Sequence, residues 1–246
     1  MRRAALLALL LLAVAAASAQ AGALSGRTVV IDPGHNGGNA THLDLIGRQV
    51  WAGTLWKDCD TMGATSADGY TEPAHNWDVA LRVRRILRAA GARVVLTRRS
   101  NAGVGPCITQ RAAVGSRVRA DAAVSIHADG SLDGGNRGFH VILPADAGQG
   151  ARMLRRSRAL GIAIRDALRA DGPTAVSNYI GANGLIARDD LGGLNLSSVP
   201  KVFTEIGNMR SPYDAPLIES PAGREREARA IAAGIQAYLL RVARRA

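Results

Sequence analysis

The chain has 246 residues and carries 31 lysines and arginines against 20 aspartates and glutamates, a formal net charge of +11. This length suits one α/β domain, since single domains of about 200–250 residues are common. The sequence has no internal repeats, low-complexity tracts or linkers, which argues against a repeat or multidomain architecture.

Residues 1–19 are predicted to be a signal peptide. Arg2 and Arg3 form a positive start, residues 4–17 are unbroken apolar sequence, and Ala17-Ser18-Ala19 fits the small-x-small cleavage pattern. This apolar run is shorter than the roughly 20 residues needed to span a bilayer, although an uncleaved anchor is the alternative. We therefore expect export to the periplasm or cell wall, a mature domain over residues 20–246, and no transmembrane segment after cleavage.

The positive charge has a different meaning outside the cytoplasm. Inside the cell it would suggest a nucleic-acid-binding protein. Outside the membrane the available polyanions are cell-wall polymers and lipid headgroups, so we expect no nucleic acid and consider retention at an anionic envelope. The alternative is that the charge serves solubility alone, because arginines such as Arg82, Arg85, Arg152 and Arg156 occupy solvated helix positions. We expect a monomer.

Strands and helices alternate along the chain. Residues 27–31 form a buried strand, and a helix begins at Thr71 and ends at Gly91 with one apolar face. Later strands are predicted over residues 93–97, 122–127, 138–143, 184–187 and 200–206. Later helices are predicted over residues 110–119 and 149–170 and from Ser220-Pro221 onward.

This order predicts the fold class. Near-continuous apolar strands separated by amphipathic helices indicate a mostly parallel sheet with helices on both faces. We expect a single three-layer α/β/α domain with a twisted sheet of about six strands. Ligands of such sheets bind at the carboxyl ends of the strands. His35, His127 and Glu205 lie at or just past strand ends, and Glu72 begins a helix that faces the same edge.

Two imidazoles and one carboxylate at this edge predict a zinc site. His35, Glu72 and His127 would leave a fourth position open, as in hydrolytic zinc sites, and Glu205 could take and return a proton. Each residue has a structural alternative when taken singly. His35 could be a turn residue, Glu72 could favour the helix dipole, and Glu205 could form a salt bridge with Lys201 or an arginine.

The ordered motifs resemble the zinc-dependent N-acetylmuramoyl-L-alanine amidases, which cut peptidoglycan between muramic acid and the stem peptide. The similarity covers about residues 27–240 and lies in residues 32–37 (DPGHNG), Glu72 with Asn76, residues 125–128 (SIHA) and residues 204–208 (TEIGN). The resemblance implies one zinc ion per chain, held by His35, Glu72 and His127, with Glu205 as the catalytic carboxylate. A zinc peptidase acting within the stem peptide, or a non-catalytic wall-binding regulator, remains an alternative.

Other polar residues near the predicted ligands, and the remaining histidines, are expected to have structural roles. Asp32 and Asn76 are candidates for holding the ligands in orientation. His75 is expected near the ligands or at the surface, and His42 and His140 in the core or at the surface.

The long insertion over residues 39–70 is predicted to contain a hairpin that turns near Ala52-Gly53. It would form either a wall of the substrate groove or a stabilising flap. Cys59 and Cys107 are the only cysteines, and in an exported chain such a pair predicts one disulfide. A cysteine-zinc role is the competing interpretation.

Overall fold

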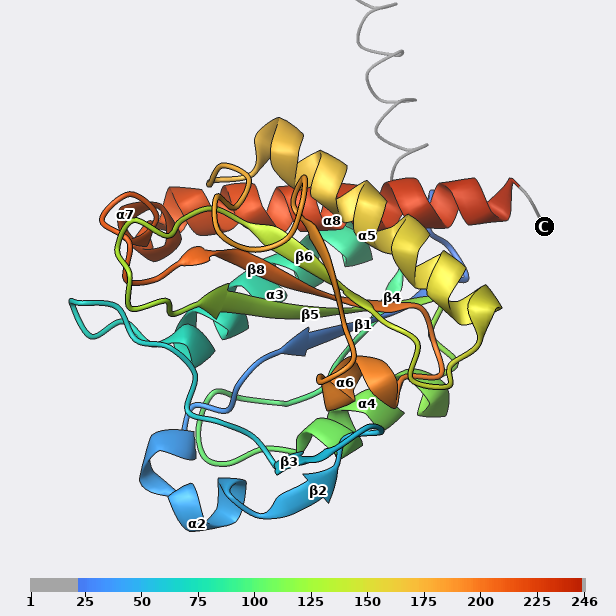
Figure 1. Ribbon diagram of the computed structural model, residues 1–246. Coiled ribbons are helices and arrows are strands. Elements are labelled where there is room, and N and C mark those ends of the chain that lie inside the picture. The colour runs from blue at the N-terminus through green and yellow to red at the C-terminus, as the bar shows by residue number, and fades with distance from the viewer. Residues whose placement is uncertain (1–21, 245–246) are drawn as a thin grey trace, which may run out of the picture.

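The computed structural model describes residues 22–244 of the chain (Figure 1). The predicted signal peptide lies outside the described residues. No helix within them is long and apolar enough to cross a membrane.

A six-stranded sheet forms the centre of the molecule, in the order β4-β1-β5-β8-β6-β7. Its strands are β1 (Thr28–Pro33), β4 (Arg93–Leu96), β5 (Ala122–Asp129), β6 (His140–Pro144), β7 (Leu185–Arg188) and β8 (Lys201–Asn208). β4, β1, β5 and β8 run parallel, whereas β6 pairs antiparallel with β8 and parallel with β7. The predicted mostly parallel sheet is confirmed, with β6 and β7 reversed.

Helices cover both faces of this sheet. One layer contains α3 (Glu72–Ala89), α5 (Ala151–Asp171) and α8 (Pro221–Ala243). The other face carries α4 (Ile108–Arg117) and α6 (Gly192–Asn195), and α7 (Ala215–Glu219) precedes α8. Side chains alternate between faces along β1: Val29 and Ile31 join the larger core, and Val30 packs with the smaller one near α4.

The boundaries of the long helices follow from local chemistry. At the start of α8, the Ser220 hydroxyl accepts a hydrogen bond from the Gly223 amide at 2.9 Å, and Pro221 occupies the first turn. This is the predicted N-cap, which supplies an acceptor for an amide that lacks a helical partner. α3 carries Glu72 as its first residue, so the helix start sets the position of that carboxylate.

The insertion folds into short elements beside the sheet. After η1 (Asn39–Thr41) and α2 (Leu43–Ile46), the predicted hairpin is present as β2 (Gln49–Trp51) and β3 (Trp56–Asp58). The predicted disulfide between Cys59 and Cys107 is also present and joins the end of this hairpin to the start of α4. Figure 1 shows the insertion projecting beside α4 and α6.

Candidate metal centre

Three predicted ligand residues converge at the carboxyl edge of the sheet. His35 follows β1, Glu72 begins α3 and His127 lies in β5, and one ligand atom of each lies within 4.8 Å of the others. Nδ1 of His127 is 2.9 Å from Oε1 of Glu72, and Nε2 of His35 is 3.7 Å from Oε2. Two imidazoles and a carboxylate on rigid elements fit a borderline divalent cation such as zinc.

Two glycines allow these side chains to meet. A Cβ atom at Gly34 would overlap the His127 ring. At Gly63 a Cβ would lie 2.8 Å from both Oε2 of Glu72 and Cδ2 of His35, and its φ of +80° is one that glycine adopts readily. The cluster therefore depends on backbone close to the ligands, including a segment of the insertion.

Asp60 holds His35 from the side away from Glu72. Its Oδ1 lies 2.5 Å from Nδ1 of His35, and its Oδ2 accepts a hydrogen bond from Nδ2 of Asn36 at 2.8 Å. Ligand histidines commonly donate their second ring N–H to a carboxylate, which fixes the ring and its tautomer. Burial lowers the pKa of His35, but the charges of Glu72 and Asp60 outweigh it and raise that pKa.

Asp60 and its contact were missed from the sequence. The residue lies inside the insertion, 25 positions from His35, and no motif marks it. Its position next to Cys59, whose disulfide fixes that part of the chain, was the available signal.

Glu72 is held in ionised form by donors around it. The amide of Ala64 donates to Oε2 at 2.8 Å, and Nδ2 of Asn76 donates to Oε1 at 3.1 Å. Burial favours the neutral acid, but His35, His127 and the Ala64 amide lower the pKa of Glu72 far below its ordinary value. Asn76 also donates to the carbonyl of Gly34, so it links α3 to the segment that carries His35.

Asp32 does not contact His35, Glu72 or His127, but it forms a buried hydrogen-bond network at the end of β1. Its buried carboxylate accepts hydrogen bonds from Nζ of Lys201 at 2.8 Å, Nη1 of Arg111 at 2.9 Å and Oγ of Ser125 at 2.5 Å. Burial raises its pKa, but the two cations hold that pKa well below its usual range. Nη1 of Arg111 also donates a hydrogen bond to the Pro33 carbonyl at 3.0 Å. This network therefore fixes the end of β1, which His35 follows in the chain.

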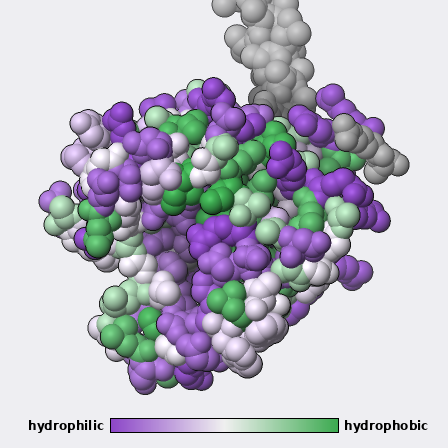
Figure 2. Space-filling model, viewed as in Figure 1, coloured by the Kyte–Doolittle hydropathy of each residue, from purple (hydrophilic) through white to green (hydrophobic). Residues whose placement is uncertain are grey.

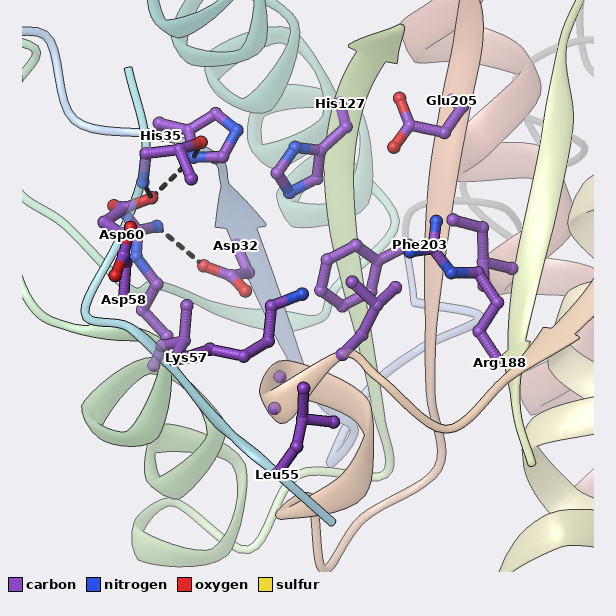
Figure 3. A pocket seen from close by; sticks show the side chains of 18 of the residues that line it. Asp32, His35, Leu55, Lys57, Asp58, Asp60, His127, Arg188, Phe203 and Glu205 are labelled. Carbon is purple, nitrogen blue, oxygen red and sulfur yellow. Dashed lines mark hydrogen bonds and ion pairs between the residues drawn. The ribbon is translucent and has the colours of Figure 1, made fainter. Parts of the chain in front are cut away.

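Glu205 lies beside the cluster on β8, in register with His127 on β5 and with His140 on β6. Figure 3 shows its carboxylate directed toward His127. Within residues 22–244 it forms no salt bridge, and Lys201, its proposed alternative partner, pairs with Asp32 instead. Burial, followed by the charges of Glu72 and Asp129, raises the pKa of Glu205 well above its ordinary value.

The other histidines stay outside the cluster. His75 is fully buried, with Nε2 3.0 Å from Oε2 of Glu227 on α8, so its expected place near the ligands or at the surface was wrong. His140 is buried in the core, and burial lowers its pKa to about 4. His42 is exposed on the insertion.

Two pockets meet at the cluster and form one open groove. The larger, of about 510 Å³, extends toward the hairpin and has apolar walls that include Leu55, Trp56 and Phe203. The smaller, of about 400 Å³, is lined by polar groups that include Ser131 and Arg210. Both contain His35, Thr61, His127 and Glu205. A ligand can therefore extend from the cluster in two directions.

A sequence model of the family described as N-acetylmuramoyl-L-alanine amidase matches residues 29–237. The chain belongs to this family. It is 41% identical over 231 residues to the N-acetylmuramoyl-L-alanine amidase Rv3717 of Mycobacterium tuberculosis, with 92% of each protein covered. The expected family resemblance is thereby confirmed.

Solved structures of the family share the fold. The amidase Ami1 from Mycobacterium smegmatis has a TM-score of 0.82 at 40% identity, with 88% of this chain and 98% of that chain covered. The apo form of Ami1 from Mycobacterium abscessus has a TM-score of 0.79 at 41% identity, with 87% of this chain and 99% of that chain covered. The amidase AmiC2 of Nostoc punctiforme has a TM-score of 0.66 at 27% identity, with 87% of this chain and 98% of that chain covered.

Proposed function

We propose that the protein is a zinc-dependent hydrolase that cleaves the amide between the lactyl group of N-acetylmuramic acid and L-alanine. The observation that carries this proposal is the meeting of His35, Glu72 and His127 beside Glu205 in an open groove. Family membership supplies the substrate class, peptidoglycan or its fragments.

His35, Glu72 and His127 would hold the zinc ion. When bound, zinc would polarise the amide carbonyl and lower the pKa of a bound water toward about 7. Asp60 would keep the His35 ring in place, and the network of Asp32 would keep the strand end rigid. The side chains would thus be ordered before substrate arrives, which reduces reorganisation during the reaction.

Glu205 would move the proton. It would accept a proton from the attacking water as the water oxygen bonds to the carbonyl carbon. It would then deliver this proton to the L-alanine nitrogen as the carbon–nitrogen bond breaks. A raised pKa suits this exchange, because an acid–base group acts best when its pKa is near the working pH.

Digestion of purified muramyl peptides, with and without a chelator, tests the reaction. Mass spectrometry of the products should show sugar free of peptide, and the chelator should stop the cleavage until zinc is restored. Trimmed stem peptides still attached to sugar would instead indicate a zinc peptidase. Binding without turnover in the presence of zinc would indicate a regulator.

We also infer export by a cleaved signal peptide over residues 1–19. The family acts on the cell wall, which lies outside the cytoplasmic membrane, and a disulfide is characteristic of oxidising compartments. N-terminal sequencing of protein recovered from the periplasm or wall should begin at Gln20. Recovery of a chain that still begins with residues 1–19 would contradict cleavage.

Retention on anionic wall polymers is the proposed role of the positive charge. Several exposed arginines form no ion pair within residues 22–244, and six of these lie in the first half of α5 or at the end of α8: Arg152, Arg155, Arg156, Arg158, Arg241 and Arg244. Cations at the start of a helix are unfavourable for its dipole. A stabilising role is therefore a poor explanation for Arg152, which lies in the first turn of α5.

A matched pair of variants tests this surface. Arg152→Gln with Arg155→Gln should weaken binding to isolated walls at low salt and leave it unchanged at high salt, because salt screens exposed charges. Arg226→Gln with Arg229→Gln removes the same charge, but these arginines face Asp171 at 3.8 and 3.7 Å. Equal weakening by both pairs would mean that total charge alone matters. Size-exclusion chromatography should give a monomer.

A further inference from the structure

The hairpin formed by β2 and β3 is fixed as a wall of the groove. The disulfide of Cys59 holds its base. At its other end the Thr54 hydroxyl donates to the Asp189 carbonyl at 2.5 Å, and Nδ2 of Asn195 donates to the Ala52 carbonyl at 2.9 Å. Between them, Nζ of Lys57 donates to the Asp190 carbonyl at 2.9 Å. Both ends are therefore attached to the body of the protein.

This wall presents two exposed tryptophans. Trp51 and Trp56 are cross-strand partners, 47% and 63% exposed, and their rings meet edge to face with centroids 5.8 Å apart. Six of the eleven exposed large hydrophobic residues in the described chain lie within residues 43–62. Figure 2 shows hydrophobic surface over α2, beside the hairpin. Exposed apolar groups gathered in this way mark an interaction surface.

The tryptophan surface is continuous with the candidate metal centre. Trp56 and Leu55 line the same groove as His35, His127 and Glu205. Figure 3 shows Leu55 at the opposite end of this pocket from His127 and Glu205. A substrate that reacts at the cluster and extends along this groove therefore reaches the hairpin.

Of the charged groups at this end of the groove, Arg188 and Lys57 are paired, whereas Asp58 accepts a hydrogen bond from the Gln49 side chain and has no ion-pair partner among residues 22–244. Arg188 binds Asp190 through two hydrogen bonds of 2.7 and 2.6 Å, and Lys57 also faces Asp190 at 3.7 Å. In the smaller pocket, by contrast, Arg210 has no ion-pair partner among residues 22–244. The hairpin end therefore has no unpaired lysine or arginine among residues 22–244 and suits a neutral ligand. At the other end Arg210 offers one cation to a carboxylate, beside the acidic side chains of Asp129 and Glu205.

We propose that Trp51 and Trp56 bind the glycan strand of the substrate, and that the stem peptide extends toward Arg210. This inference rests on the proposed function, because that substrate has a sugar arm and a peptide arm on either side of the scissile amide. Pyranose rings are neutral and have apolar C–H faces that stack on indole. Tryptophan offers a large rigid contact area at a low entropic cost.

Binding of peptide-free glycan strands, measured by titration calorimetry with the zinc-loaded protein, tests the proposal without any turnover. Trp56→Ala should weaken this binding at least about tenfold, which corresponds to about 1.4 kcal/mol. Tyr213→Ala is the matched control, because Tyr213 is 61% exposed and does not line the groove. Failure of the wild-type protein to bind these strands, or equal weakening in both variants, would overturn the proposal.

Cleavage kinetics locate the two arms. With long glycan substrates Trp56→Ala should raise KM at an unchanged kcat, and Trp56→Phe should restore part of the loss. With a muramyl peptide that carries one sugar, the change should be small. A loss that follows stem-peptide length and not glycan length would place the peptide on the hairpin and refute the assignment. Absence of cleavage by the wild-type protein would refute the proposed function instead, while the binding measurement would still report on the tryptophans.

Discussion

Replacement of Glu205 by glutamine separates a proton-transfer role from a structural one. The change keeps the size of the side chain and removes its charge. General acid–base groups typically contribute about 10²–10⁴-fold, or roughly 3–5 kcal/mol of the barrier. We expect Glu205→Gln to lower kcat at least about a hundredfold by that estimate, with zinc content unchanged because His35, Glu72 and His127 supply the ligands.

The same variant should be more stable than the wild type at neutral pH, although it is less active. Glu205 has no salt bridge within residues 22–244, and burial together with Glu72 and Asp129 raises its pKa. A carboxylate whose folded-state pKa is raised costs stability once the pH passes its unfolded-state value near 4.5. In chelator-treated protein, Glu205→Gln should therefore match the wild type at acid pH and be the more stable of the two at neutral pH.

Three measurements decide this prediction: turnover of a muramyl peptide, zinc content by elemental analysis, and urea unfolding across the pH range. Near-normal turnover would show that another group is the base. Loss of zinc would make Glu205 a ligand. A variant that is less stable than the wild type at neutral pH would show that the carboxylate has a stabilising partner, contrary to the geometry described above.

Further predictions concern the metal site and the insertion. His127→Ala should lose most of its zinc while it keeps its circular dichroism spectrum, and full occupancy would remove His127 from the ligand set. Asp60→Asn should weaken zinc affinity about 10–100-fold in a competition titration, because it loses the carboxylate that holds His35; the exposed Asp44→Asn should have no effect. Replacement of Cys59 and Cys107 by serine should lower the free energy of unfolding by up to about 4 kcal/mol, since the disulfide closes a separation of 48 residues. Urea denaturation measures this loss, and unchanged stability would mean that the bond does not form in the exported protein.

The sequence alone determined the fold class and the main members of the site. All six strands of the sheet were predicted, because apolar runs and helical periodicity are local patterns. His35, His127 and Glu205 were expected to meet because the carboxyl ends of parallel strands share one edge. Gly34 lies in the family motif of residues 32–37, but neither its spatial role nor that of Gly63 could be predicted, since that role depends on which side chains approach each glycine.

Only the tertiary structure decided which groups hold the site in place. Asp60 meets His35 across 25 positions, and Lys201 meets Asp32 across 169. Such contacts depend on the path of the insertion and on the order of strands in the sheet, which no local pattern encodes. The same reason applies to the reversed β6 and β7 and to Trp56, whose place on the groove wall follows from where the hairpin is attached.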